Sequence, residues 1–143
     1  MNKLLLCLAS FCLMTALSAQ NTIPLWQDAA TPFRPGAERA IVPKVYRVLQ
    51  LDTAAMLLRL AGAPDESVAN SSVSSYTLEL PRPDGRMEAF RFCESPIMAP
   101  GLAQRFPQIK TYLGKGVDNP TALVRLDYTH HGFHAMVLVG EDT

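Results

Sequence analysis

The stretch "YTLELPRPDGRMEAFRF" (residues 76–92) decides the fold, because it holds two alternating segments on either side of a turn. Tyr76, Leu78 and Leu80 fall on one face of the first segment, and Phe90 and Phe92 fall on one face of the second. The "RPDG" between them supplies the proline, aspartate and glycine that are typical of a tight turn. The stretch therefore predicts a β-hairpin with one apolar face.

The chain before this hairpin predicts a strand and then a helix. Residues 44–52 alternate between apolar and polar positions, which is the pattern of a strand with one apolar face. Asp52 then offers an N-cap oxygen for a helix that places Met56, Leu57 and Leu60 on one side. Gly62 follows the last apolar position and is expected to end the helix.

The chain after the hairpin predicts a marginal helix and three strands. Two helical turns are expected around residues 102–106, and a short strand at 109–114. Residues 121–129 and 133–140 form a second hairpin pattern around "HHG". The expected fold class is α+β: a small, mostly antiparallel sheet of two β-hairpins plus one or two further strands, with one clear helix and one short helix.

The N-terminus predicts export. Lys3 precedes an apolar run from Leu4 to Leu17, and small residues follow, which is the layout of a secretory signal peptide over residues 1–19. The expected location is secreted or periplasmic, with no membrane contact after the signal is removed. A retained N-terminal anchor is the alternative, although the run is short for a membrane span.

The rest of the chain divides into an arm and a domain. Residues 20–43 are interrupted by prolines and read as an extended arm, loosely attached, that Trp26 and Phe33 could hold to the domain of residues 44–143. Without the signal the chain has 12 Lys and Arg against 13 Asp and Glu, a net charge of −1, and Cys93 is the remaining cysteine. This composition indicates neither a nucleic-acid-binding protein nor a disulfide scaffold, and it leaves no electrostatic steering to rely on.

The three histidines of the chain, His130, His131 and His134, lie within five positions and raise the question of a metal site. We expect His130 and His131 in the turn of the last hairpin, with Gly132 at a positive φ. Neighbouring positions near a strand end project to opposite sides, so these side chains are not expected to converge on one ion. The prediction is no metal site and no cofactor.

Other chemistry-bearing residues give weaker patterns. Ser95 lacks the glycines of a nucleophile elbow, and "GKG" at 114–116 lacks the spacing of a phosphate loop. Glu79, Glu88 and Glu94 are expected on solvent-facing positions of strands. Cys93 alternates with Phe92 and so belongs to the other face of its strand. Its side chain is either a small buried residue or a reactive thiol, and both interpretations remain open.

Four motifs in the same order resemble the N-terminal region of secreted, reprolysin-like zinc metallopeptidase precursors of Bacteroidota. They are E-S-P-x-M-x-P-x-L-A at 94–103, P-x-I-x-T-Y-x-G-x-G at 107–116, R-x-D-x-T at 125–129 and G-F-H-A-M at 132–136. The likeness extends over about residues 44–143. The family-like positions are Glu94, Ser95, Pro96, Met98, Pro100, Tyr112, Gly114, Gly116, Arg125, Asp127, Gly132, Phe133 and His134.

The resemblance implies a propeptide that assists the folding of a zinc metallopeptidase catalytic domain and keeps it latent, with no catalytic site of its own. Such precursors continue into an H-E-x-x-H-x-x-G-x-x-H motif, whereas this sequence ends at "GEDT", so we expect a propeptide region as a fragment or truncated product. Cys93 is a candidate zinc-switch thiol, although its strand position argues against that role. The alternative is a stand-alone secreted binding module or protease inhibitor that uses an exposed sheet edge.

Overall fold

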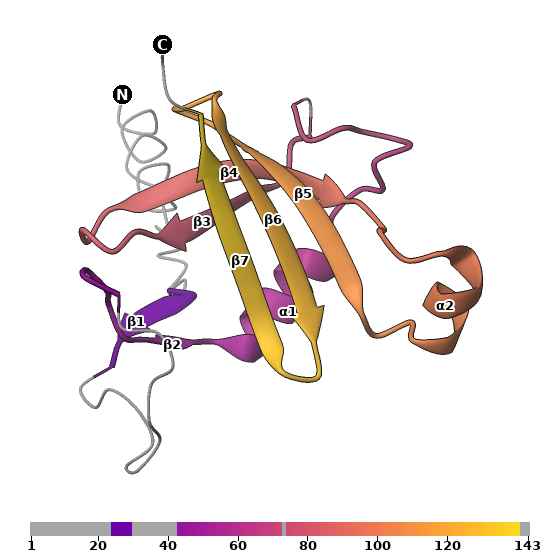
Figure 1. Cartoon of the computed structure of the whole chain (residues 1–143), viewed down its shortest axis with the longest axis horizontal. Coiled ribbons are helices and arrows are strands. Elements are labelled where there is room, and N and C mark those ends of the chain that lie inside the picture. Colours follow the sequence, from indigo (N-terminus) through magenta and orange to yellow (C-terminus); the bar gives the residue numbers. More distant parts are fainter. Residues whose placement is uncertain (1–23, 30–42, 73, 141–143) are drawn as a thin grey trace, which may run out of the picture.

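The computed structural model describes residues 24–29, 43–72 and 74–140, and these residues form two sheets and two helices (Figure 1). The expected signal peptide (1–19) and Phe33 lie outside the described residues. The elements in chain order are β1 (Trp26–Asp28), β2 (Leu49–Leu51), α1 (Thr53–Ala61), β3 (Thr77–Pro81), β4 (Met87–Glu94), α2 (Pro100–Arg105), β5 (Lys110–Gly116), β6 (Ala122–Thr129) and β7 (Gly132–Val139).

The main sheet has five antiparallel strands in the order β3-β4-β5-β6-β7, so each strand pairs with its neighbours in sequence. The two predicted hairpins are its two ends, β3–β4 and β6–β7. A separate two-stranded sheet pairs β1 with β2. The predicted fold class, an α+β domain with a mostly antiparallel sheet, one clear helix and one short helix, is confirmed.

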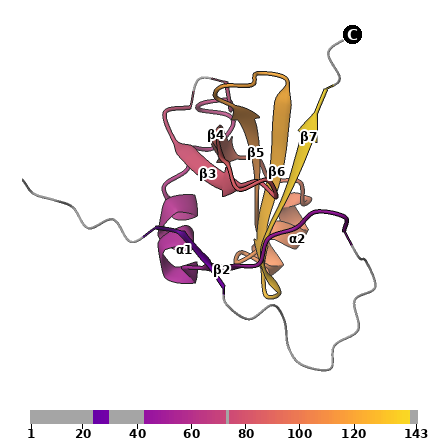
Figure 2. The same cartoon turned by 90° about the vertical axis from the view of Figure 1, so that its left-hand side faces the viewer.

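Helix α1 begins at the predicted cap and packs on one face of the main sheet (Figures 1 and 2). The Asp52 carboxylate accepts a hydrogen bond from the Ala55 N–H at 2.9 Å, which satisfies one of the free donors of the first turn. Met56 and Leu60 are buried against the sheet, whereas Leu57, expected beside them, is 43% exposed. The buried stripe of the helix is therefore narrower than its sequence suggests.

The sheet face that contacts α1, called the inner face below, holds the hydrophobic core. Its buried side chains alternate along the strands, as a period of two requires. They are Leu78, Leu80, Phe90, Phe92, Tyr112, Ala122, Val124 and Leu126. The opposite face, called the outer face, carries the residues between these positions.

Two glycines of β5 let the strands approach the core closely. A Cβ on Gly114 would lie 2.5 Å from Val124 Cγ1 and 3.2 Å from the Arg91 carbonyl oxygen. A Cβ on Gly116 would lie 2.2 Å from the Asn119 carbonyl oxygen. Both distances are shorter than the contact distance of non-bonded atoms, so a side chain at either position would clash with its neighbour. Glycine at these two family-like positions therefore permits the close packing.

The segment before α1 differs from the predicted strand over residues 44–52. Only Leu49–Leu51 is a strand, because its partner is the three-residue β1, with Trp26 opposite Leu51. The arm of residues 20–43 thus contains a strand at Trp26–Asp28, and Trp26 packs against the core cluster. The interpretation of the arm as a loose linker does not extend to residues 24–29.

Candidate functional site

The family-like polar residues gather on the outer face of β5 to β7. Arg125 of β6 donates from Nη1 to Ser95 Oγ at 3.2 Å, across the strand between them. Ser95 is 5% exposed, and its backbone N–H and carbonyl bond to Thr111 at 2.9 and 2.7 Å. Ser95 is therefore a buried residue that links neighbouring strands. The partner of its hydroxyl is the Arg125 cation, which cannot act as a general base.

Asp127 and His134 form a second polar pair on the same face. They are directly opposite each other in the β6–β7 ladder, and His134 Nδ1 lies 2.8 Å from Asp127 Oδ1. The His134 side chain is 52% exposed and the Asp127 side chain is 38% exposed, so water screens the interaction. The pair orients the imidazole ring but does not place it next to a nucleophile among the described residues.

The other two histidines occupy the turn, as predicted, and Gly132 has the expected positive φ of 111°. The expectation that their side chains project to opposite sides is wrong, because the ring centroids of His130 and His131 lie 3.8 Å apart. Alternation applies within a strand and not across a two-residue turn. Over residues 24–29, 43–72 and 74–140, no group of three or more His, Cys, Asp or Glu side chains is arranged to hold a metal ion.

Cys93 lies on the outer face, as predicted, and is buried there at 1% exposure. Its Sγ lies 3.8 Å from the Leu113 carbonyl oxygen, and the neighbouring Asp65–Glu94 bridge brings the loop after α1 to this end of β4. Burial and the nearby Glu66 carboxylate raise the pKa of the Cys93 thiol. A buried thiol that resists ionisation is a poor zinc ligand, so its environment favours a packing role.

The remaining family-like positions have structural contacts. Tyr112 meets Phe92 edge-on in the core, with ring centroids 6.0 Å apart, and Phe133 packs against Trp26 at 5.9 Å. Pro100 opens α2. Pro96 and Met98 line a shallow hollow of about 160 Å³ beside α2.

Two glutamates lie on positions that were expected to face solvent but share the inner-face alternation with Phe90. Glu88 pairs with Arg82 at 2.7 Å, and Glu94 pairs with Lys110. The two carboxylates are 16% and 23% exposed. They lie at the two ends of β4, next to Arg82 and Lys110. Of the three glutamates, Glu79 is the one that is exposed as expected.

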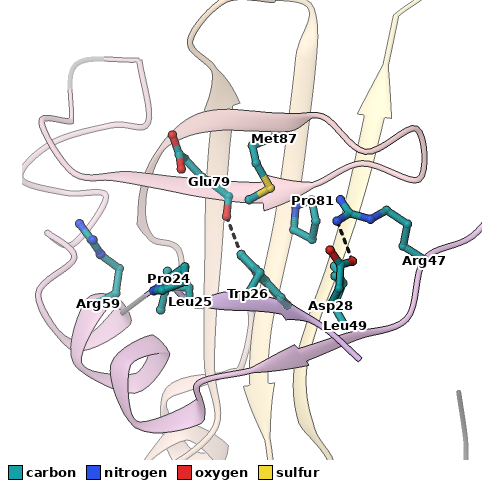
Figure 3. A pocket seen from close by; sticks show the side chains of 10 residues that line it. All are labelled: Pro24, Leu25, Trp26, Asp28, Arg47, Leu49, Arg59, Glu79, Pro81 and Met87. Atoms are coloured by element: carbon teal, nitrogen blue, oxygen red, sulfur yellow. Dashed lines mark hydrogen bonds and ion pairs between the residues drawn. The ribbon is translucent and has the colours of Figure 1, made fainter. Parts of the chain in front are cut away.

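A cavity of about 470 Å³ lies between the β1–β2 sheet and β3 (Figure 3). Its walls are mostly apolar, with one ion pair between Asp28 and Arg47 at 2.9 Å. The lining residues are Pro24, Leu25, Trp26, Asp28, Arg47, Leu49, Arg59, Glu79, Pro81 and Met87. Nothing in the sequence pointed to this cavity, because the strand that encloses it is only three residues long.

The two edges of the main sheet differ in their availability. In an antiparallel sheet, alternate residues of an edge strand direct their backbone N–H and C=O groups away from the neighbouring strand. The bonds from Val117 N–H to Ala89 O and from Ser95 N–H to Thr111 O fix this alternation. In both β3 and β7, the backbone groups of the odd-numbered residues point away from the sheet and are called outward. On β3, the Trp26 indole N–H binds the outward Glu79 carbonyl at 2.9 Å (Figure 3), and the outward Pro81 has no N–H. The β3 edge is therefore poorly suited to pairing with a further strand, and it is called the blunted edge below.

The other edge of the main sheet is β7, and within residues 24–29, 43–72 and 74–140 no strand pairs with its free side. The outward backbone groups belong to Phe133, Ala135, Val137 and Val139, and no described residue outside β6 bonds to the β7 backbone. The strand carries neither lysine nor proline, the residues that proteins commonly place on an exposed edge. It is therefore the segment best suited to pair with another chain.

None of the described helices is long and apolar enough to cross a membrane. Compared with known proteins, the chain matches no family model, no curated protein and no solved structure.

Proposed function

We propose that this chain is a propeptide-like domain of an exported zinc metallopeptidase precursor, which assists the folding of the catalytic domain and holds it latent. The four motifs at 94–103, 107–116, 125–129 and 132–136 support the partner class by resemblance. The domain binds its partner and contributes no catalytic group. Export through residues 1–19 belongs to the same proposal, so sequencing of the exported protein should find an N-terminus near Gln20 or Asn21.

The observation that supports this proposal most is the open edge of β7. An extended segment that pairs with an edge strand gains main-chain hydrogen bonds along its length, whatever its side chains. A peptidase cleft receives its substrate as an extended segment. A domain that presents an unpaired strand to such a cleft would occupy it in a substrate-like manner, and the rigid sheet behind β7 would keep the segment from being cleaved.

Latency by cleft covering fits the environment of Cys93 better than latency by zinc ligation. The thiol is 1% exposed and lies under the loop after α1, and burial raises its pKa. To reach a zinc ion it would have to leave the sheet and ionise. We therefore assign Cys93 to packing and the inhibitory contact to β7.

The second candidate function is a stand-alone secreted binding module or protease inhibitor, and the same open edge favours it. The two candidates differ in their genetic context and partner. A zinc-motif reading frame directly downstream, and co-purification with its product, indicates the propeptide. Tight inhibition of unrelated peptidases indicates the free-standing inhibitor.

The direct test supplies the chain in trans to a zinc metallopeptidase catalytic domain encoded in the same genome. Wild type should inhibit peptide hydrolysis, and Ala135→Pro should abolish the inhibition, because it removes an outward N–H without touching the β6–β7 ladder. The matched control is Thr77→Pro, which removes an outward N–H on the blunted β3 edge and should inhibit as wild type does. Thermal unfolding of both variants verifies that they fold.

Cys93→Ser then separates the two modes of latency. Retained inhibition supports cleft covering, whereas its loss in a folded variant supports a zinc–thiolate contact. If wild type neither binds nor inhibits any metallopeptidase domain of that genome, the propeptide proposal fails.

A further inference from the structure

Three basic residues, Arg91, Lys115 and Arg125, are neighbours on the outer face of the sheet. Arg91 of β4 is directly opposite Lys115 of β5 in the ladder, and Arg125 of β6 is the diagonal neighbour of Lys115, because Lys115 pairs with Leu123. Like charges directly opposite each other destabilise a sheet. A neutral residue at either position would remove this cost.

The described carboxylates do not neutralise these outer-face cations. Several other cations of the domain form ion pairs, as in Arg47–Asp28, Arg82–Glu88 and Lys110–Glu94. Arg91 and Lys115, by contrast, have no described carboxylate within 4.0 Å, and Arg125 binds the neutral Ser95 hydroxyl.

The outer-face acids nearest to these cations, Glu79 and Asp127, form no ion pair with them. Glu79 is diagonal to Arg91, and Asp127 is held by His134. The three outer-face cations therefore exceed these two acids by one positive charge, although the whole chain has a formal net charge of +0.

Exposed apolar side chains lie beside two of the outer-face cations, Lys115 and Arg125. Leu123 is 43% exposed, and its cross-strand partner Leu138 is 52% exposed. Met136, opposite Arg125, is 57% exposed. Cations beside exposed leucine and methionine are what an interface needs to select an acidic partner and then exclude water from the contact.

We propose that the outer face of β4 to β7 is a docking surface for a protein that presents carboxylates next to apolar side chains. The inference rests on the proposed function only in that the domain binds a protein, and it adds the chemistry of that protein's surface. Leu138 and Met136 belong to β7, so this surface adjoins the open edge, and one partner can contact both.

A protein partner fits better than a membrane or a nucleic acid. Lipid-binding patches commonly use clusters of four to eight basic residues, and nucleic-acid surfaces use a longer basic stripe. Here three cations alternate with leucines, and Asp127 on the same face would repel phosphates. A surface that mixes apolar side chains with a few charges at defined positions corresponds to the centre of a protein interface.

The inference changes what is expected of the binding rate. A net charge near zero predicts no electrostatic steering, but the local electric field depends on how the charges are arranged and not on their sum. Association with the partner should slow as salt rises, because charges that are farther apart than about 8 Å are screened at physiological ionic strength.

The first test uses stability alone and requires no partner. Lys115→Glu turns the like-charged pair with Arg91 into an opposite-charge pair, so the Tm of the full chain should rise by about 2 °C at low salt. The rise should shrink in 1 M NaCl. Lys44→Glu, the same charge change at an exposed position outside the sheet, is the control and should leave the Tm unchanged. A Tm that falls or stays constant in Lys115→Glu contradicts the unrelieved repulsion.

The second test uses a helical peptide of about 20 residues with Glu and Leu on one face, since a helix cannot add to the β7 edge as a strand. Wild type should bind it at least tenfold more tightly than the same peptide with Gln for Glu. Lys115→Glu should weaken binding by about tenfold, whereas Lys44→Glu and Ala135→Pro should stay within twofold of wild type.

The outcomes separate this inference from the proposed function. Equal binding of the two peptides, or unchanged binding by Lys115→Glu, overturns the docking surface even if metallopeptidase inhibition is found. Tighter binding to phosphatidylserine vesicles than to the peptide also overturns it, in favour of a membrane surface. Peptide binding without any metallopeptidase inhibition leaves the docking surface standing and removes only the proposed partner.

Discussion

The inner and outer faces of the main sheet are built from alternate residues of the same strands, yet they have opposite properties. In β5, Tyr112, Gly114 and Gly116 face α1 and are buried, while Leu113 and Lys115 between them face outward. The inner face tolerates little change, because its side chains and close backbone contacts fill the space. The outer face is partly exposed and includes a repulsive pair. Most of the buried apolar side chains therefore lie on the inner face, and the exposed part of the outer face is free to be selected for binding.

The largest effect is expected on the inner face. Phe90 is fully buried in the core cluster, so Phe90→Ala should lower the free energy of unfolding by about 3–5 kcal/mol. Urea unfolding followed by circular dichroism measures this loss. A loss below about 1 kcal/mol would mean that the core is not organised around the inner face.

The second effect comes from backbone approach. Gly114→Ala should cost about 1–3 kcal/mol, because the new Cβ would lie 2.5 Å from Val124 Cγ1. Adding Val124→Ala removes the closest atom, so the double variant should lose less than the sum of the two single losses. Additive losses would show that the clash is with the Arg91 carbonyl instead.

The third effect is a dependence on pH. Burial, with a smaller contribution from Glu94, raises the pKa of Tyr112 to about 12, above the value of about 10 expected in the unfolded chain. The native state then keeps a proton that the unfolded state loses, so the Tyr112 contribution is full below pH 10 and falls as pH rises towards 12.

Tyr112→Phe isolates this contribution. Between pH 10 and 11 wild type should lose about 1 kcal/mol more of its unfolding free energy than the variant does. Urea titrations at both pH values provide the comparison, and parallel losses in the two proteins would place the Tyr112 hydroxyl in water.

The smallest effect is expected on the outer face. Met136→Ser replaces a side chain that is 57% exposed, so the free energy of unfolding should change by no more than about 0.5 kcal/mol. The same change should weaken binding of the Glu and Leu peptide. A destabilisation as large as that of Phe90→Ala would erase the distinction between the two faces.

The hairpins were predictable from the sequence because their signals are local. Alternation in residues 76–92 and the "RPDG" turn specify β3–β4, and the turn before Gly132 specifies β6–β7. β1 was not predictable, since three residues after Pro24 carry no periodicity and depend on pairing with β2. The cavity of Figure 3 exists only once that pairing forms.

The outer-face cations were hidden for a related reason. Arg91 and Lys115 become neighbours through the register of β4 with β5, and the long connection through α2 separates the two strands in sequence. Charge counting reports only the total. Cys93, in contrast, was assigned to the outer face by alternation alone, but its burial depends on a loop whose path the sequence does not reveal.

Trp26 gives the domain a built-in optical probe. It is the single tryptophan of the chain, and its ring meets Phe133 of β7 while its N–H binds the Glu79 carbonyl of β3. Indole emission shifts to longer wavelength when the ring enters water, so the fluorescence spectrum reports whether the N-terminal arm is seated. Far-ultraviolet dichroism reports the sheet separately. Detachment of the arm can thus be followed in a folded protein, without a label and at the same time as partner binding.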